Sequence, residues 1–495
     1  MDILYKSTRS DTEGITASKA ILKGLADDGG LFVPDRIPEL KVSPSELKDM
    51  DYKATAYEVM RLFLTDYSEE ELKSCIERAY DEKFDDKDIA PLKKVGDRYF
   101  LELFHGKTIA FKDMALSILP HLLTTAIRKN NSDKEVVILT ATSGDTGKAA
   151  LAGFSDVEHT RIIVFYPKGG VSRIQELQMV TEKGRNTKVV AVRGNFDDCQ
   201  SQVKAIFNDE ELKKEMASKG FAFSSANSIN IGRLIPQVAY YVYAYGRMLK
   251  EGYIKDGEEI NFTVPTGNFG NILAGYYAKL IGLPIGKLVC ASNDNKVLYD
   301  FFETGIYDKN REFILTSSPS MDILISSNLE RLIYMIGGSD AVRNEALMKS
   351  LKEKGRYEIT GDMREKLESF AGFYSTEEEV SKTIKELYTK DGYITDTHTA
   401  VAVNAERKYR ESLGDCRKNV IVSTASPYKF AKSVYDSIKG QSSGMDDFEI
   451  IDKLEEMSKV KIPPAIHEIR NAKILHDEVC DREGMKDTVK KSLGL

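Results

Sequence analysis

The sequence has few of the residues that build disulfide frameworks and metal sites. Its 495 residues include only five cysteines, an odd number spread widely along the chain. The six histidines include no pair at the i, i+4 spacing that places two imidazoles on one face of a helix. This composition argues against a disulfide-stapled fold and a metal centre, and it fits a reducing compartment. We therefore expect a cytoplasmic protein without a bound metal.

Long apolar runs and dense basic clusters are also missing. No uninterrupted apolar stretch approaches the roughly 20 residues that span a bilayer, and residues 1–7 lack the basic region and apolar core of a secretory signal. The formal net charge is −7, whereas proteins that bind phosphate backbones usually carry a basic stripe. We expect neither a membrane nor a nucleic acid among the partners of this protein.

Short apolar runs alternate with helical patterns through the middle of the chain. They are continuous rather than alternating, which is typical of strands in a parallel sheet that is covered on both faces. The runs span residues 136–140, 161–166, 188–192, 262–264, 288–291 and 420–422. The pattern predicts an α/β fold with two parallel-rich sheets, after a mostly helical region that ends near residue 90.

Proline and glycine mark the expected breaks in this pattern. Residues 98–104 predict a strand, and residues 113–128 predict a helix that Pro120 kinks or divides. Residues 440–444 resemble a flexible connector before a charged, mostly helical tail, which the pair Pro463-Pro464 must interrupt.

Lys112 lies in a setting that is unusual for a lysine. It follows Ala110 and Phe111, and its other neighbours are mostly small or apolar. Because desolvation disfavours an ammonium ion, a lysine here could be a neutral amine that is ready to form a Schiff base. Most lysines lie on solvated surfaces, so the residue type alone does not separate the two interpretations.

Two glycine-rich turns follow predicted strands and precede predicted helices. Ligands of open α/β sheets bind beyond the carboxyl ends of strands, and N–H groups at a helix N-terminus attract anions. The first turn, residues 140–147, is not a nucleotide P-loop, because Thr142 and Ala149 stand where glycine and Ser/Thr are required. The second, residues 265–271, lacks the GxGxxG spacing of dinucleotide sites. Each is either a phosphate-binding loop or an ordinary turn.

Two further polar segments lie near expected strand ends. Thr424, in the segment 423–430, offers a hydroxyl that could hydrogen-bond a ring nitrogen of a cofactor. Arg233 ends the polar segment 224–233 and offers a planar fork for a carboxylate or a phosphate. Taken alone, the first is better explained by a Ser/Thr-rich turn and the second by a surface salt bridge.

In this order, the segments resemble the threonine synthase family of fold-type II pyridoxal-phosphate (PLP) enzymes. The resemblance begins with residues 5–9 and 24–34 and continues through the Lys112 segment, residues 143–147, 227–233 and 267–271. It implies the α/β fold of the tryptophan synthase β type. It also implies a helical N-terminal domain (1–90), a large PLP-binding domain (91–135 and 232–495) and a smaller substrate domain (136–231).

The resemblance further implies a reaction and its residues. The expected reaction converts O-phospho-L-homoserine and water to L-threonine and phosphate through a PLP Schiff base. Lys112 would form that Schiff base and later move protons, while Thr424 would face the pyridine nitrogen. The residues that would hold the cofactor phosphate are Gly267, Asn268, Phe269, Gly270 and Asn271. The candidates on the substrate side are Ser143, Gly144, Asp145, Thr146, Asn227, Ser228, Asn230, Arg233 and Lys429, without a division between its phosphate and its carboxylate.

The chain departs from the family pattern at two places. Lys107 stands where the family usually has proline, and its charge would lower the pKa of Lys112 if the two side chains approach each other. Residues 426–428 read Ser-Pro-Tyr where the family usually has His-Pro-Ala, so no role of a histidine is carried over there. A PLP-dependent serine/threonine dehydratase of the same fold and a homologue without catalysis are the alternatives. The oligomeric state stays open.

Overall fold

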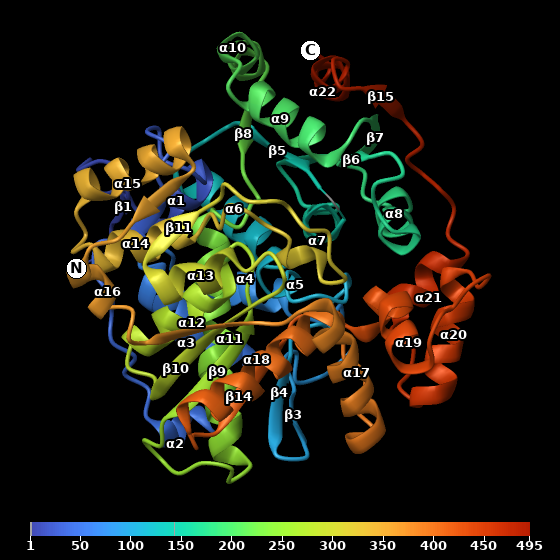
Figure 1. The fold of residues 1–495 in the computed structure, drawn as a ribbon. Helices are drawn as coiled ribbons and strands as arrows, with labels where there is room; N and C mark the ends of the chain where they lie inside the picture. The colour runs from blue at the N-terminus through green and yellow to red at the C-terminus, as the bar shows by residue number, and fades with distance from the viewer. Residues whose placement is uncertain (1, 143) are drawn as a thin grey trace.

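The computed structural model describes residues 2–142 and 144–495, and its largest sheet has six strands in the order β13-β10-β9-β14-β4-β3 (Figure 1). Neighbouring strands are parallel except for the antiparallel pair β3 and β4. Their bounds are β3 Leu92–Val95, β4 Arg98–Glu102, β9 Ile260–Pro265, β10 Ile285–Ser292, β13 Phe370–Tyr374 and β14 Asn419–Ser423. Val420 of β14 is level with Tyr99 of β4 and Phe262 of β9, so these three strands end near one another.

Side chains of this sheet alternate between two separate cores. Val420 and Val422 belong to one core together with Leu101, whereas Ile421 and Phe100 belong to another, as the period of two in a strand requires. Helix α12 packs against β9 and β10 on one side, and α18 packs against β9, β10, β13 and β14 on the other. The helices that build these layers are α11 Ile231–Lys250, α12 Gly270–Leu280, α17 Glu377–Asp391, α18 Thr397–Leu413 and α19 Ala431–Lys439.

The second large sheet has five parallel strands in the order β15-β7-β6-β5-β8. They are β5 Glu135–Ala141, β6 Thr160–Pro167, β7 Thr187–Arg193, β8 Phe221–Ser224 and β15 Val479–Asp481. Helices α7 Asp145–Phe154, α8 Arg173–Val180, α9 Phe196–Phe207, α10 Glu210–Ser218 and α22 Met485–Leu493 accompany this sheet. Val137 and Leu139 face a core with α9 and α22, and Val136 and Ile138 face the main core of the molecule.

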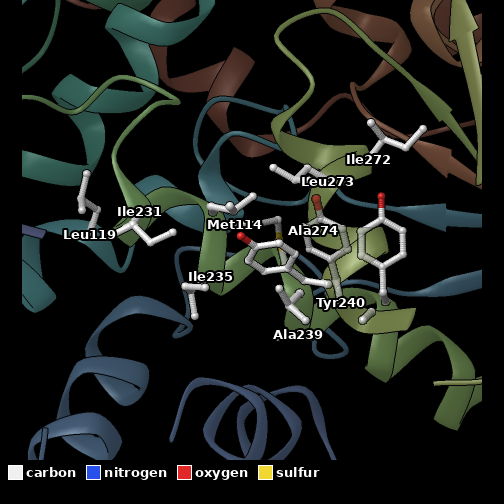
Figure 2. Close-up of a cluster of buried hydrophobic side chains, with 14 of the residues drawn as sticks. Met114, Leu119, Ile231, Ile235, Ala239, Tyr240, Ile272, Leu273 and Ala274 are labelled. Carbon is white, nitrogen blue, oxygen red and sulfur yellow. The ribbon is translucent and has the colours of Figure 1, made fainter. Parts of the chain in front are cut away.

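Helix α11 lies at the centre of the main core. Nearly all of its side chains are buried, and a helix that is apolar all round must be covered on every side. Figure 2 shows Ile231, Ile235 and Tyr240 of α11 beside Met114 and Leu273. Met114 belongs to α5 (Asp113–Leu116) and Leu273 to α12, so α11 connects the segment that carries Lys112 with the second glycine-rich turn.

The N-terminal region is mostly helical, as expected. Its elements are β1 Tyr5–Ser7, α1 Ala17–Lys23, β2 Phe32–Pro34, α2 Pro44–Leu47, α3 Tyr52–Phe63 and α4 Glu69–Ala79. Helix α3 begins where the Asp51 carboxylate accepts a hydrogen bond from the N–H of Ala54. Helix α4 begins with a reciprocal capping box between Ser68 and Glu71, which satisfies N–H groups that the first turn leaves unpaired. Helix α3 packs along α11, so this region closes one side of the main core.

The remaining elements lie mainly after β10. They are α6 Leu119–Lys129, α13 Val297–Thr304, β11 Ile306–Asp308, η1 Pro319–Met321, α14 Leu329–Ile336, α15 Ala341–Lys354, β12 Arg356–Glu358, α16 Gly361–Glu365, η2 Pro427–Phe430, α20 Asp447–Ser458 and α21 Pro464–Arg470. No described helix is long and apolar enough to cross a membrane.

Most of the expected elements are present. The six apolar runs form β5, β6, β7, β9, β10 and β14. The helix expected at residues 113–128 is divided into α5 and α6, with Pro120 in the first turn of α6, where a backbone N–H is not required. Residues 440–446 connect α19 to α20, and residues 459–463 separate α20 from α21, which begins at Pro464.

The end of the chain lies differently from the expected division into domains. Residues 232–495 were assigned to the large domain, but β15 pairs in parallel with β7 of the five-stranded sheet. Helix α22 then packs against α9 of that same sheet. Residues 479–493 therefore belong to the five-stranded sheet, where β15 pairs with the side of β7 that does not face β6. The division into three domains otherwise stays a prediction.

Candidate active site

Lys112 lies at the N-terminus of α5, beyond the end of β4, and its amine is surrounded by polar groups. Its side chain is 12% exposed. The Nζ atom donates to Oδ2 of Asp145 at 3.4 Å and to Oγ of Ser320 at 3.2 Å, and it lies 5.1 Å from the centre of the Phe111 ring. The sequence predicted a desolvated lysine here, and the structure places it in such an environment.

Burial lowers the pKa of the Lys112 amine below its usual value. The attraction of Asp145 opposes this effect, while repulsion from Lys429 and Arg233 adds to it. Lys107, the residue that replaces the usual proline, is exposed. The cations that act on Lys112 are thus Lys429 and Arg233, which are distant in the sequence.

Asp145 is the first residue of α7, beyond the end of β5, and it lies between two lysines. Its Oδ1 atom is 3.1 Å from Nζ of Lys429 and accepts a hydrogen bond from Gln175 at 3.0 Å. Its Oδ2 atom accepts from Ser320 at 2.7 Å and from Lys112. Burial alone would raise the pKa of this carboxyl group, but Lys429 and Lys112 hold it far below its usual value. Asp145 is therefore a carboxylate at any physiological pH.

Lys429 has a fully buried side chain in η2, just beyond β14. Besides its ion pair with Asp145, its Nζ atom donates to the carbonyl of Thr108 at 2.8 Å. Thr108 belongs to the turn that leads to Lys112, and both its N–H and its hydroxyl donate to the carboxylate of Asp113. Lys429 therefore connects the strand-end segment after β14 to the segment that positions Lys112.

Thr424 also lies at this strand end. Its carbonyl accepts a hydrogen bond from the N–H of Phe111 at 2.8 Å, and its side chain is largely buried. The next residue, Ala425, forms an isolated antiparallel bridge with Ala110. The ends of β4 and β14 are thereby joined, so Thr424 and Lys112 lie on adjacent segments. The role of Thr424 toward a cofactor ring stays a prediction.

The second glycine-rich turn, residues 267–271, connects β9 to α12 beside Ser320. A Cβ atom on Gly267 would lie 2.6 Å from the carbonyl oxygen of Ser320, so the two segments touch and only glycine fits. The carbonyl of Gly267 accepts from the Ser326 hydroxyl, and that of Asn268 accepts from the N–H of Asn328. Phe269 has a φ of 64°, in the left-handed region.

The donors of this turn suit a phosphate group. The backbone N–H groups of Gly267, Asn268, Phe269 and Gly270 have no acceptor among the described residues, and they precede the positive end of the α12 dipole. Nδ2 of Asn271 is buried and also lacks an acceptor in the described part of the chain. With the pKa-lowered amine of Lys112 nearby in the fold, these groups fit the aldehyde and the phosphate of PLP.

Side chains of the turn contribute less than its backbone. The ring of Phe269 is buried, with its centre 5.9 Å from that of Phe370. The Oδ1 atom of Asn271 accepts from the hydroxyl groups of Tyr240 and Tyr241 at 2.6 and 2.7 Å. Phe269 can therefore offer a ligand its backbone but not its ring. The side chain of Asn271 is held in place by the two tyrosines of α11.

The first glycine-rich turn also leads into a helix, but two of its N–H groups are already paired. The hydroxyl of Thr142 accepts hydrogen bonds from the N–H groups of Gly144 and Gly147, which holds the turn at the start of α7. Gly144 has a φ of 134° and leaves no room for a Cβ, which would lie 2.4 Å from the Gln175 side chain. Thr146 is partly exposed. Ser143, also predicted here, lies outside the described residues.

The segment 227–233 and this turn follow the adjacent parallel strands β8 and β5, so both lie toward the same edge of the sheet. Asn227 is exposed and Ser228 partly exposed, so both are open to a ligand. Asn230 is fully buried, and its side chain is occupied by Gly232, Ile21 and Ser225 as the cap of α11. A direct contact of the Asn230 side chain with a substrate would require these bonds to break.

Arg233 is buried and keeps an unused donor. Its Nη1 atom donates to the carbonyl of Ala226 at 3.0 Å, and its Nε has no partner among the described residues. Burial lowers the pKa of its guanidinium to about 10, so it is still charged at neutral pH. An anion is the ligand that would satisfy such a group.

The sequence did not predict three residues that meet at this site. Ser320 contacts Lys112 and Asp145, Gln175 contacts Asp145, and His398 accepts a hydrogen bond from the N–H of Ser320 at 3.1 Å. None lies in a glycine-rich or strand-end motif of the kind that marked the other segments. The segment Asp396-Thr397-His398, a capping residue followed by a helix, was the available signal.

Comparisons with known proteins identify the family of this chain. Family models described as the threonine synthase N terminus, pyridoxal-phosphate dependent enzyme and the threonine synthase C-terminal part match residues 4–80, 90–426 and 399–472. Threonine synthase from Saccharomyces cerevisiae is 36% identical, with 92% of this chain and 94% of the yeast protein covered. For threonine synthase from Pseudomonas aeruginosa, the identity is 37% and the coverages are 89% and 92%.

The solved structures lead to the same family. The PLP-bound threonine synthase from Brucella melitensis superimposes with a TM-score of 0.88 at 33% identity, and the match covers 100% of both chains. The expected fold type, the PLP cofactor and action on a small-molecule substrate are thereby confirmed. From the site and from these likenesses together, the chain belongs to the threonine synthase family of PLP-dependent enzymes.

Proposed function

We propose that the protein converts O-phospho-L-homoserine and water to L-threonine and phosphate. The single observation that carries this proposal is the buried cluster in which Lys112 and Lys429 flank Asp145 of the first glycine-rich turn, near the second turn, whose N–H groups at 267–270 have no acceptor among the described residues. One turn suits the phosphate of the cofactor. The other turn and Arg233 remain for a substrate that carries both a carboxylate and a phosphate.

PLP would be held covalently by Lys112 and through its phosphate by the N–H groups of residues 267–271, with Thr424 on the side of its ring nitrogen. When bound, it supplies an electron sink for the bonds broken at the substrate. The protein contributes the orientation and the electrostatics.

Lys112 is suited to move protons once the amine of the substrate has taken its place. Its lowered pKa leaves a larger neutral fraction than an exposed lysine has at neutral pH, and a neutral amine can accept a proton from the α-carbon. Asp145 and Ser320 hold the Nζ atom, so the amine stays in the site after its release.

Charge in the site favours a substrate with two anionic groups. Lys429 balances Asp145, and Arg233 adds a positive charge whose Nε is unused among the described residues. The open side chains of Asn227 and Ser228 add neutral donors on the same side. We assign these residues and the turn at 144–146 to the substrate, with its phosphate and its carboxylate divided among them.

The decisive experiment measures phosphate and threonine from O-phospho-L-homoserine, with and without added PLP. Equal amounts of both products in the presence of PLP support the proposal. Formation of ammonia and a keto acid from threonine or serine, without phosphate release from phosphohomoserine, would instead show a dehydratase. Turnover of none of these substrates would leave the proposal without support and favour a protein that has lost catalysis.

A further inference from the structure

The hydroxyl of Ser320 bridges Lys112 and Asp145, although Ser320 lies 208 residues from Lys112 in the sequence. Nζ of Lys112 donates to Ser320 Oγ at 3.2 Å, and Ser320 Oγ donates to Asp145 Oδ2 at 2.7 Å. The same Oδ2 atom accepts from Lys112 at 3.4 Å. The amine, the hydroxyl and the carboxylate thus form a closed triangle.

This triangle determines where the lone pair of a neutral Lys112 amine points. A neutral amine has two N–H bonds and one lone pair. Asp145 is ionised and can only accept, and the hydrogen of the Ser320 hydroxyl is already donated to Asp145. Both contacts of Nζ therefore use its N–H bonds, and the lone pair is directed away from both acceptors. It is free to attack an aldehyde carbon or to accept a proton.

His398 fixes the backbone of Ser320. The N–H of Ser320 donates to Nε2 of His398 at 3.1 Å. Since a backbone N–H can only donate, Nε2 must be unprotonated, and the ring hydrogen is on Nδ1. That nitrogen lies 2.8 Å from Oδ2 of Asp396, which accepts its hydrogen. The hydrogen bonds alone thus assign the tautomer of His398.

The imidazole itself is held rigidly. Asp396 caps α18 by accepting from the N–H of Thr399, and the ring of His398 lies 4.7 Å from the ring of Phe430, next to Lys429. The Thr397 hydroxyl also donates to the carbonyl of Ser317 at 2.8 Å, a second connection between α18 and the segment of Ser320.

We propose that Ser320 is a further catalytic residue that orients the amine of Lys112, and that His398 is a positioning residue that acts through Ser320. The effect of Ser320 on the overall reaction rests on the proposed function. Its effect on PLP capture does not, because the protein binds PLP before any substrate binds. In this assignment, the loss of either group leaves the amine free to rotate, so its lone pair points at the aldehyde for a smaller fraction of the time.

The test measures how fast the full-length, cofactor-free protein captures PLP, by stopped-flow absorbance of the lysine-bound form. Misplacement of a reacting group costs up to about 100-fold in rate. We expect roughly tenfold or slower capture for Ser320→Ala and for His398→Leu. Ser320→Thr keeps a hydroxyl and His398→Gln keeps a hydrogen-bond acceptor. Each is therefore expected to capture PLP at a rate closer to that of the wild type than Ser320→Ala or His398→Leu does. The exposed residues Ser201 and His467 supply the controls Ser201→Ala and His467→Leu.

A double variant separates positioning from general destabilisation. If His398 acts through Ser320, the variant Ser320→Ala/His398→Leu captures PLP about as slowly as Ser320→Ala alone, because their effects are not additive. Unchanged capture in Ser320→Ala would overturn the catalytic assignment. Multiplied effects in the double variant, or a loss in His398→Leu that His398→Gln does not relieve, would overturn the assignment of His398.

PLP capture and threonine formation, measured on the same variants, distinguish a failure of this proposal from a failure of the proposed function. A wild-type protein that captures PLP but forms no threonine would refute the proposed function, and slower capture in Ser320→Ala would still support the role of Ser320. Conversely, threonine formation with equal capture in all variants would refute the role of Ser320 alone.

Discussion

Replacing Lys429 by methionine tests whether this buried cation sets the charge state of Lys112. The change removes the positive group 3.1 Å from Asp145 and the donor to the carbonyl of Thr108. Removal of one partner from a buried ion pair typically costs 3–5 kcal/mol. Asp145 keeps Ser320, Gln175 and Lys112 as donors, so we expect the lower end, about 3 kcal/mol.

The same substitution is expected to raise the pKa of Lys112. Repulsion from Lys429 lowers that pKa in the wild type, and without it Asp145 attracts the ammonium form with less competition. At a fixed pH below the pKa, the neutral fraction of Lys112 falls, and the pH profile of PLP capture moves to higher pH. Urea unfolding measures the first effect, and the capture rate as a function of pH measures the second.

Lys148→Met is the matched control for this prediction. Lys148 forms another largely buried pair, with Glu182 at 2.8 Å, and is not among the charges with the largest effects on the pKa of Lys112. It should lose stability without a change in the pH profile of capture. A profile in Lys429→Met that stays in place, or moves to lower pH, would refute the electrostatic argument.

Three further predictions concern single residues. Lys112→Ala should abolish the near-visible absorption of lysine-bound PLP, and a covalent adduct that persists in this variant would show that another lysine binds the cofactor. Burial opposes protonation of His105, but hydrogen bonds to Asp85 and Glu102 outweigh it and raise the pKa to about 9. Its stabilisation is therefore complete below the unfolded pKa of about 6.5 and is lost as the pH rises through about 9, so urea unfolding of wild type and His105→Gln should converge at high pH. Gly267→Ala should weaken PLP binding in a fluorescence titration, since its Cβ would meet the Ser320 carbonyl, whereas Gly361→Ala meets no atom within 4 Å and should bind normally.

Local patterns in the sequence were enough for most of the fold. The continuous apolar runs predict β5 to β7 because both faces of those strands are covered, and Pro120 predicts the break between α5 and α6 because of its missing N–H. The apolar runs did not predict strands β8 and β13. β8 is short and half-exposed, and β13 contains Gly372, where a Cβ would be 3.0 Å from the Phe302 side chain.

The candidate site was predictable where it depends on motifs and not where it depends on tertiary contacts. Lys112 and the turn at 267–271 combine a local signal with the family resemblance. Ser320 and His398 come from segments whose local sequence indicates only a turn and a helix start, and their place beside Lys112 arises from the folding of loops after β10 and before α18. The return of β15 to the five-stranded sheet is likewise a pairing of distant segments.

The cluster of Lys112, Asp145 and Lys429 also connects the two sheets at the site. Asp145 extends from the end of β5 in the five-stranded sheet, whereas Lys112 and Lys429 extend from the ends of β4 and β14 in the six-stranded sheet. A buried ion pair adds little net stability, but separating its partners leaves buried charges uncompensated. Because the attraction falls with distance and with the entry of water, these ion pairs oppose sliding of one sheet past the other. Asp145 and Lys429, which shift the pKa of Lys112, therefore also hold the two halves of the site together.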